Sequence, residues 1–427
     1  MHARRQKVRF PKTTTLGTLA LTALSIGFST TPCNEAAAES SRSSEKDVRN
    51  ATVFERPRDH YDPIGIPVGS FRFWPRLDLS ESYDDNIFAV NANKKSDFET
   101  LIEPSARLTS EWSRHSFLVE AGGHFHRFMD LKTENNTEFD STAALHLDLG
   151  RGAEANAKTS YQRLTVARSD PEESGGIRPE QMDVFNTELS WSQPFGHFKP
   201  SVTAAFSDQK ERESINSDKD RRYFIGKFRL SYVASPAINA FVEPTYTVTD
   251  FKQSSDRFGF NRDSNEFAVN FGVAYDITGI LYGETSAGFY SVNFADTRFK
   301  DDSSFRISSK TTWSISPVAS LIANVSRSSI VTNTVGSSNR VETGGSLTFQ
   351  YELLRNLLLD GTASVARDKF NEIQRNDTTI GFKAGAQLFL NNNVALVAKY
   401  DFLRRTSSIP EAEFTENRVM IGIRGQF

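Results

Sequence analysis

Apolar and polar residues alternate along most of the chain after Ser70. The alternation is clearest at residues 417–427, where every second position is taken by Val419, Ile421, Ile423, Gly425 and Phe427. The positions between them are largely polar. A period of two is typical of a β-strand with one apolar face, so we expect the chain to end in a strand.

The same pattern recurs in other parts of the chain. It is found at residues 224–232, 305–315 and 340–353. In the first of these segments Phe228 faces one way and Lys227 the other. We therefore expect many strands of similar length rather than one isolated hairpin.

Short turns and long polar loops follow one another in regular order. Eight short turns, of which residues 390–394 are one, alternate with nine longer loops, of which residues 167–180 are one. This order predicts eighteen antiparallel strands with both chain ends on the short-turn side, a pattern typical of bacterial outer-membrane barrels. A soluble β-sandwich can alternate too, but it does not usually hold so many long strands in up-and-down order.

A membrane barrel must also close. In lipid every backbone N–H and C=O group needs a partner, and closure of the sheet removes its free edges. The last strand, 417–427, is therefore expected to pair with the first strand, 70–81. The predicted fold class is all-β, a transmembrane antiparallel up-and-down barrel of about eighteen strands.

Composition agrees with a sheet that is apolar on one side. The mean hydropathy is −0.45 and 38% of the residues are hydrophobic, yet the chain contains 34 Phe and 11 Tyr. Beyond the N-terminus no apolar run is long enough for a membrane-spanning helix. Disorder is disfavoured because disordered chains are poor in aromatic residues.

The N-terminus has the organisation of a secretory signal peptide. A basic stretch, residues 4–12, precedes an apolar core, residues 15–28, and small residues precede a cleavage position after Ala38. We therefore predict a signal peptide over residues 1–38, whose removal would take away the single cysteine of the chain. Lipidation at that cysteine, Cys33, is the alternative, but the residues before it lack the usual leucine and small residue of a lipoprotein signal.

A polar segment, residues 39–69, separates the signal peptide from the predicted barrel, residues 70–427. Pro57, Pro63 and Pro67 exclude a regular helix across it. One interpretation is a solvated periplasmic leader. The other is a docking strip or a segment tucked into the mouth of the barrel.

A run of motif residues stands at the start of the predicted barrel. It comprises Arg56, Pro57, Arg58, Tyr61, Asp62, Pro63, Gly65, Gly69, Ser70, Phe71, Pro75, Tyr83, Asp84, Asp85 and Asn86. Together with residues 98–123, it resembles the β-barrel porin 2 family found with bacterial exopolysaccharide gene clusters. The resemblance implies an outer-membrane barrel with a part in polysaccharide secretion. The terminal Phe427 likewise resembles the signal that the outer-membrane assembly machinery recognises.

Sequence motifs for catalysis are absent. There is no nucleophile elbow and no phosphate-binding loop, and no cysteine follows the predicted cleavage position. His124, His126 and Glu120 share one face of the strand expected at residues 116–128, where they could hold a metal or form half of a base–nucleophile site. Two histidines without a third strong ligand indicate a metal only weakly. We therefore expect no enzymatic activity, no cofactor and no metal.

Alternation also assigns charged residues to the lumen. One predicted wall is basic and comprises Arg72, Arg76, Arg107, Arg418 and Arg424. The opposite wall is acidic and comprises Glu243, Glu266 and Glu284. Two such walls would create a transverse field that orients polar solutes. The alternative is that the lumen charges pair with one another and hold water.

Barrels of sixteen to eighteen strands leave an aqueous channel. We therefore predict a channel in the outer membrane of a Gram-negative bacterium that takes part in export of an extracellular or capsular polysaccharide. The alternatives are a general diffusion or nutrient porin and a structural barrel with a plugged lumen. The expected partners are lipopolysaccharide in the outer membrane, the assembly machinery, periplasmic polysaccharide export proteins and the polysaccharide, but no nucleic acid.

Overall fold

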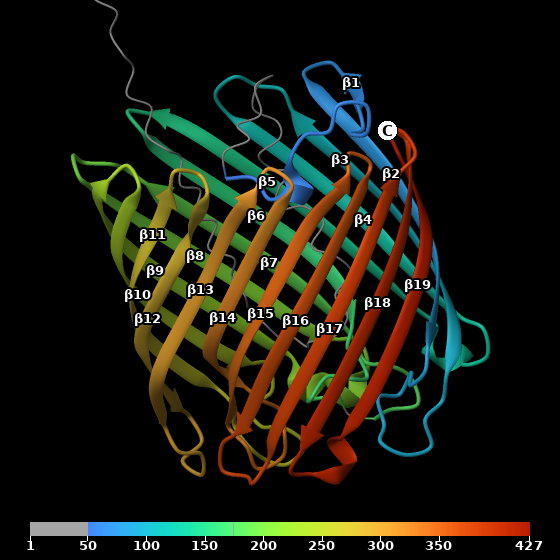
Figure 1. The fold of residues 1–427 in the computed structure, drawn as a ribbon. Helices are drawn as coiled ribbons and strands as arrows, with labels where there is room; N and C mark the ends of the chain where they lie inside the picture. Colours follow the sequence, from blue (N-terminus) through green and yellow to red (C-terminus); the bar gives the residue numbers. More distant parts are fainter. Residues whose placement is uncertain (1–49, 174) are drawn as a thin grey trace, which may run out of the picture.

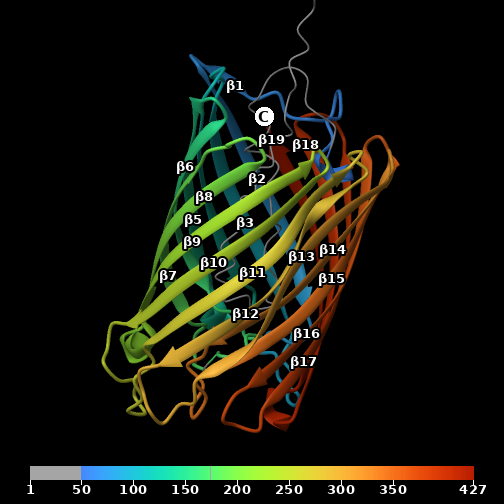
Figure 2. The same ribbon diagram turned by 90° about the vertical axis from the view of Figure 1, so that its left-hand side faces the viewer.

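Eighteen antiparallel strands, β2 to β19, follow one another around a barrel, and β19 pairs with β2 to close it (Figures 1 and 2). The computed structural model describes residues 50–173 and 175–427. The predicted fold class is confirmed. The predicted signal peptide and the alternative at Cys33 lie outside the described residues.

The strands are similar in length, apart from a short first one. They are β1 (Ile66–Val68), β2 (Phe71–Asp84), β3 (Asp97–Ser110), β4 (Ser116–Phe128), β5 (Asn136–Gly150), β6 (Ala153–Thr165), β7 (Gln181–Ser192), β8 (Phe198–Glu211), β9 (Arg221–Ser235), β10 (Ile238–Phe251), β11 (Ser264–Ile277), β12 (Leu281–Phe294), β13 (Asp302–Ser316), β14 (Ala319–Val331), β15 (Asn339–Leu354), β16 (Leu357–Phe370), β17 (Asn376–Phe389), β18 (Val394–Ser407) and β19 (Phe414–Gln426). The described residues also form short 3₁₀-helices, namely η1 (Val53–Glu55), η2 (Lys132–Glu134), η3 (Ser214–Lys219) and η4 (Pro410–Ala412). None of the helices in this part of the chain has the length and apolar character needed to span a membrane.

The connections alternate as predicted. Short turns join the strands at the end that carries the C-terminus, and the longer loops gather at the other end (Figure 1). We call these the short-turn end and the long-loop end. In outer-membrane barrels the short turns face the periplasm, so the short-turn end is the periplasmic one.

The strands have an apolar outer face. In the middle of β9, Phe228 is 43% exposed on the outside, while the adjacent Lys227 lines the interior. On β15, Leu347 is exposed in the same way. Large apolar side chains on the outside of a barrel suit contact with lipid.

Two motif residues join the first loop of the barrel to its last strand. Asn417 on β19 donates its N–H to Asp85 Oδ1 at 2.8 Å and its side-chain amide to Asp85 Oδ2 at 2.7 Å. The fully buried Asn86 donates to the carbonyl oxygen of Thr415 at 2.9 Å. These bonds hold the β2–β3 loop against β19 where the barrel closes.

The start and the end of the barrel meet at the short-turn end. β19 pairs with β2 only as far as Arg76, and β1 pairs with β2 beyond that point, at residues 71–73. The N–H group of Phe427 donates to the carbonyl oxygen of Pro75 at 3.2 Å, while its side chain is 58% exposed. β1 therefore continues the wall where the last strand ends.

Deletion of Phe427 is expected to reduce the amount of barrel inserted into the outer membrane without weakening the inserted fraction. Burial of a whole phenylalanine side chain contributes only about 2 kcal/mol, and this side chain is largely exposed. Insertion can be followed as a heat-modifiable band in the outer-membrane fraction. Phe427→Tyr should restore it, because tyrosine suits the membrane interface. Normal insertion with a lower melting temperature would assign Phe427 to packing instead.

Candidate functional site

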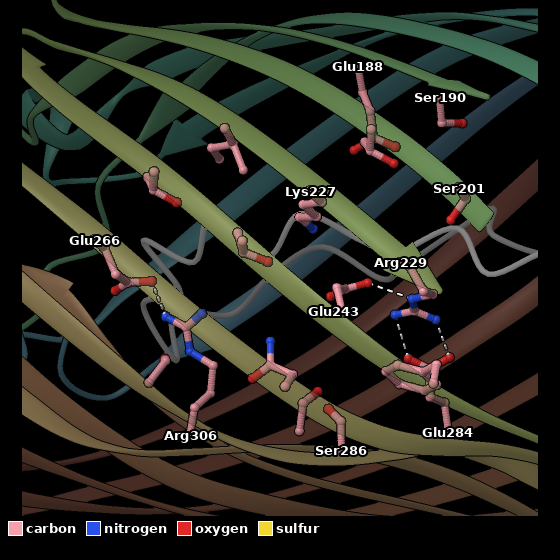
Figure 3. Close-up of a pocket in the computed structure, with 18 of the residues that line it drawn as sticks. Glu188, Ser190, Ser201, Lys227, Arg229, Glu243, Glu266, Glu284, Ser286 and Arg306 are labelled. Atoms are coloured by element: carbon pink, nitrogen blue, oxygen red, sulfur yellow. Dashed lines mark hydrogen bonds and ion pairs between the residues drawn. The ribbon is translucent and has the colours of Figure 1, made fainter. Parts of the chain in front are cut away.

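The interior of the barrel contains a cavity of about 550 Å³ (Figure 3). Side chains on β6 to β15 line it. Many of them carry hydroxyl or amide groups, including Asn156, Ser201, Thr203, Asn270 and Ser286. These groups offer hydrogen-bond donors and acceptors to water and polar solutes.

Arg229 on β9 joins two glutamates of other strands (Figure 3). Its Nε donates to Glu243 on β10 at 2.6 Å, and its terminal nitrogens donate to Glu284 on β12 at 2.9 and 3.1 Å. The guanidinium carbon lies 3.9 Å from the centroid of the Phe241 ring. Bidentate pairing and contact with the ring hold the guanidinium in one orientation, so this part of the wall is well ordered.

All three glutamates of the predicted acidic wall are paired with arginines. Glu243 and Glu284 share Arg229, and Glu266 accepts a hydrogen bond from Arg306 on β13 at 2.5 Å. The glutamates line the interior cavity. Arg229 and Arg306 therefore bring positive charge to the predicted acidic wall. The sequence alone did not single them out, because their glutamate partners lie on other strands.

The arginines of the predicted basic wall also contact carboxylates. The pairs are Arg72 with Glu111 (2.7 Å), Arg76 with Asp78 (2.5 Å), Arg107 with Glu120, Arg418 with Glu99, and Arg424 with Asp78 (2.8 Å). Some of the pairs lie directly opposite each other in strand register, such as Arg107 and Glu120. Opposite charges this close largely cancel at longer range. The arrangement corresponds to the alternative in which the lumen charges pair with one another.

The two lumen histidines also pair with carboxylates. His124 contacts Glu103 through Nδ1 and Asp140 through Nε2, each at 2.9 Å. His126 contacts Glu99, the same carboxylate that pairs with Arg418. Glu120, expected beside the histidines, contacts Arg107 instead. The histidines therefore belong to the network of paired charges along this wall.

Residues 50–69, called the leader below, lie at the mouth of the barrel at the short-turn end (Figure 1). Val53 in η1 is fully buried with Leu358, Phe389 and Ala395 of the strands β16 to β18. Its N–H donates to Ser320 Oγ on β14 at 3.1 Å. Of the two interpretations of this segment, residues 50–69 match the one tucked into the mouth.

Arg58 holds residues 50–69 together and attaches them to the barrel wall. Its side chain is only 3% exposed and donates to the carbonyl oxygens of Val53 and, at 3.0 Å, Arg56. The same guanidinium lies 3.7 Å from Glu352 on β15. Asp62 accepts the Arg58 N–H at 2.8 Å. The motif residues that carry the family resemblance therefore fold the leader and attach it to the wall.

The family comparison agrees with a membrane barrel. The family described as "Putative beta-barrel porin 2" matches residues 58–427. Among solved structures, the chain is similar to Pseudomonas aeruginosa OpdL, with 11% identity and a TM-score of 0.44 over 84% of this chain and 100% of that chain. It is also similar to P. aeruginosa OccK2, with 8% identity and a TM-score of 0.48 over 83% of this chain and 98% of that chain. A third similar structure is Acinetobacter baumannii OccAB2, with 11% identity and a TM-score of 0.45 over 84% of this chain and 98% of that chain. No curated protein matches the sequence.

Proposed function

The chain belongs to the "Putative beta-barrel porin 2" family, and we propose that this outer-membrane porin-like channel takes part in export of an extracellular or capsular polysaccharide. A cleaved signal peptide over residues 1–38 would send it from the cytoplasm toward the outer membrane. Its role is passage rather than catalysis. Periplasmic export proteins would deliver the polymer to the short-turn end.

The lining of the cavity carries this proposal. Hydroxyl and amide groups such as those of Ser201, Thr203 and Asn270 can exchange hydrogen bonds with a sugar chain as they do with water. Charged groups such as Arg229 are already paired with carboxylates. A polymer can therefore find many weak contacts and few strong ones, and conduction needs binding that is weak enough to release.

The position of the leader favours a controlled passage over a wide diffusion pore. Residues 50–69 attach to β14 and β15 from inside the mouth, as well as pairing with β2. A general porin would use the same polar lining but would need an open mouth. A structural barrel would keep the mouth closed permanently.

Two measurements separate these functions. The purified chain in liposomes is expected to admit neutral oligosaccharides in a swelling assay, and a strain lacking the protein is expected to lose surface polysaccharide. Swelling with small sugars alone and normal surface polymer in the deletion strain would indicate a diffusion porin. Absence of swelling with every sugar would indicate a structural barrel.

A further inference from the structure

The loop between β6 and β7 is attached to the wall near its own strands. This loop, residues 166–173 and 175–180, is called the transverse loop below. Arg168 donates to both carboxylate oxygens of Glu134 in η2, at 3.0 and 2.8 Å. Both side chains are buried, so this bidentate pair is a firm anchor.

The tip of the transverse loop reaches the opposite wall. The Ser169 carbonyl oxygen accepts a hydrogen bond from Arg405 on β18. Glu172 accepts from Arg340 Nε on β15 at 3.3 Å and from the N–H of Asn333 at 3.5 Å. In the closed strand order, β15 lies on the far side of the barrel from β6 and β7. The loop therefore crosses the long-loop end instead of extending into solvent.

The wall partner of Glu172 is held in place by its own strands. The Arg340 side chain is 2% exposed and also pairs with Glu342 at 3.1 Å and with Asp368 on β16. It cannot follow the loop outward without breaking these contacts. Movement of the loop therefore has to separate Glu172 from Arg340.

Three carboxylates of the transverse loop have shifted pKa values, and burial raises the pKa of Glu173. Burial raises the pKa of Asp170 to about 6; the Glu172 carboxylate adds to the rise, while Arg340 and Arg405 oppose it. Burial also disfavours the charged form of Glu172, but Arg340 and then Arg221 on β9 outweigh it and hold the pKa of Glu172 below its usual range. Glu172 is therefore ionised at neutral pH.

We propose that the transverse loop is the constriction of this channel and that the ion pair between Glu172 and Arg340 holds it across the long-loop end. This inference rests on the proposed channel function. A loop anchored at one wall and paired at the other limits the width open to a solute. A polysaccharide can leave only when the pair separates.

Glu172→Gln should open the constriction. Loss of a charge-assisted hydrogen bond is expected to raise the open-to-closed ratio about tenfold. The measurement is single-channel recording of the full mature chain in planar bilayers. The matched control is Glu213→Gln, which removes a carboxylate from an exposed position in the β8–β9 loop and should leave the ratio unchanged.

A solute that crosses the channel must pass both the leader and the transverse loop, and a closed leader could hide the effect of opening the loop. Glu172→Gln is therefore compared with its parent chain in two backgrounds. One background is the unaltered chain, and the other carries Arg58→Ala, which frees the leader. Equal currents for Glu172→Gln and its parent in both backgrounds would overturn the constriction while leaving the channel function intact. Absence of current in every variant would overturn the channel function, and the constriction with it.

A cysteine pair tests the same contact without relying on the glutamine variant. The only natural cysteine, Cys33, falls in the predicted signal peptide, so Glu172→Cys with Asn333→Cys would introduce two thiols that have no competitor in the mature chain. Oxidation should reduce the current, and a reductant should restore it. A disulfide that forms without changing the current would contradict the proposal.

Acidification should favour the closed loop. Closure raises the pKa of Asp170 to about 6, so the closed state binds the proton more tightly and gains stability as pH falls through 6. Glu172 stays ionised over most of this range, which keeps its pair with Arg340. The open-to-closed ratio should therefore fall between about pH 7.5 and 5 in the unaltered chain, and it should fall less in Asp170→Asn, in which burial still raises the pKa of Glu173. If the open-to-closed ratio of Asp170→Asn responded to pH as the unaltered chain does, the Asp170 carboxyl group would not be the origin of the response. That result would contradict a closed state in which the loop buries Asp170.

Discussion

Phe228→Arg is expected to lower the free energy of unfolding by about 2–4 kcal/mol, because it places a charge in the lipid near the bilayer midplane. Phe228 lies in the middle of β9 on the outer face. The adjacent Lys227 lines the polar interior. Lys227→Ser is therefore expected to change the same free energy by less than about 0.5 kcal/mol.

The measurement is reversible denaturant unfolding of the barrel in lipid vesicles. Leu347→Arg repeats the test on β15, where the outer face is identified independently. Similar losses for Phe228→Arg and Lys227→Ser would mean that the lipid and lumen faces of β9 are wrongly assigned.

Arg58→Ala is expected to release the leader from the short-turn mouth. The substitution leaves the carbonyl oxygens of Val53 and Arg56 without their guanidinium donor and leaves Glu352 without this cation. Breaking a buried charge pair costs about 3–5 kcal/mol. Since the eighteen-stranded wall does not depend on these contacts, the loss should fall on the leader rather than on the barrel.

The released leader should be cut by protease while the barrel stays intact, and the single-channel conductance should rise. The matched control is Asp59→Ala, which alters the next residue at an exposed position and should change neither result. A leader that becomes sensitive to protease without any rise in conductance would show that residues 50–69 do not obstruct the channel.

Alternation allowed the wall of the barrel to be predicted because it is local information. The side chains of Phe228 and Lys227 face opposite ways whatever strand lies beside them. The short turns and long loops set the number and direction of the strands, and closure then required the last strand to pair with the first. Each of these steps needs only neighbouring residues or the requirement that no strand edge be left in lipid.

The pairing of lumen charges could not be predicted in the same way. Arg229 meets Glu243 and Glu284 only because β9, β10 and β12 are aligned in a particular register. Register depends on the turns and on closure around the whole barrel, and a slip of one residue would turn each side chain to the other face. Assignment to the lumen was therefore possible from the sequence, but the choice between charged walls and ion pairs was not.

By itself, the sequence determined the strands, their faces and the end of the barrel at which the C-terminus lies. Only the tertiary structure decided where the polar connections go. Residues 167–180 have the composition of a solvated loop, yet Ser169 and Glu172 contact Arg405 and Arg340 on distant strands. The physical reason is that a polar segment satisfies its hydrogen bonds equally well in water and against a polar wall. Only the closed barrel brings that wall within the reach of the loop.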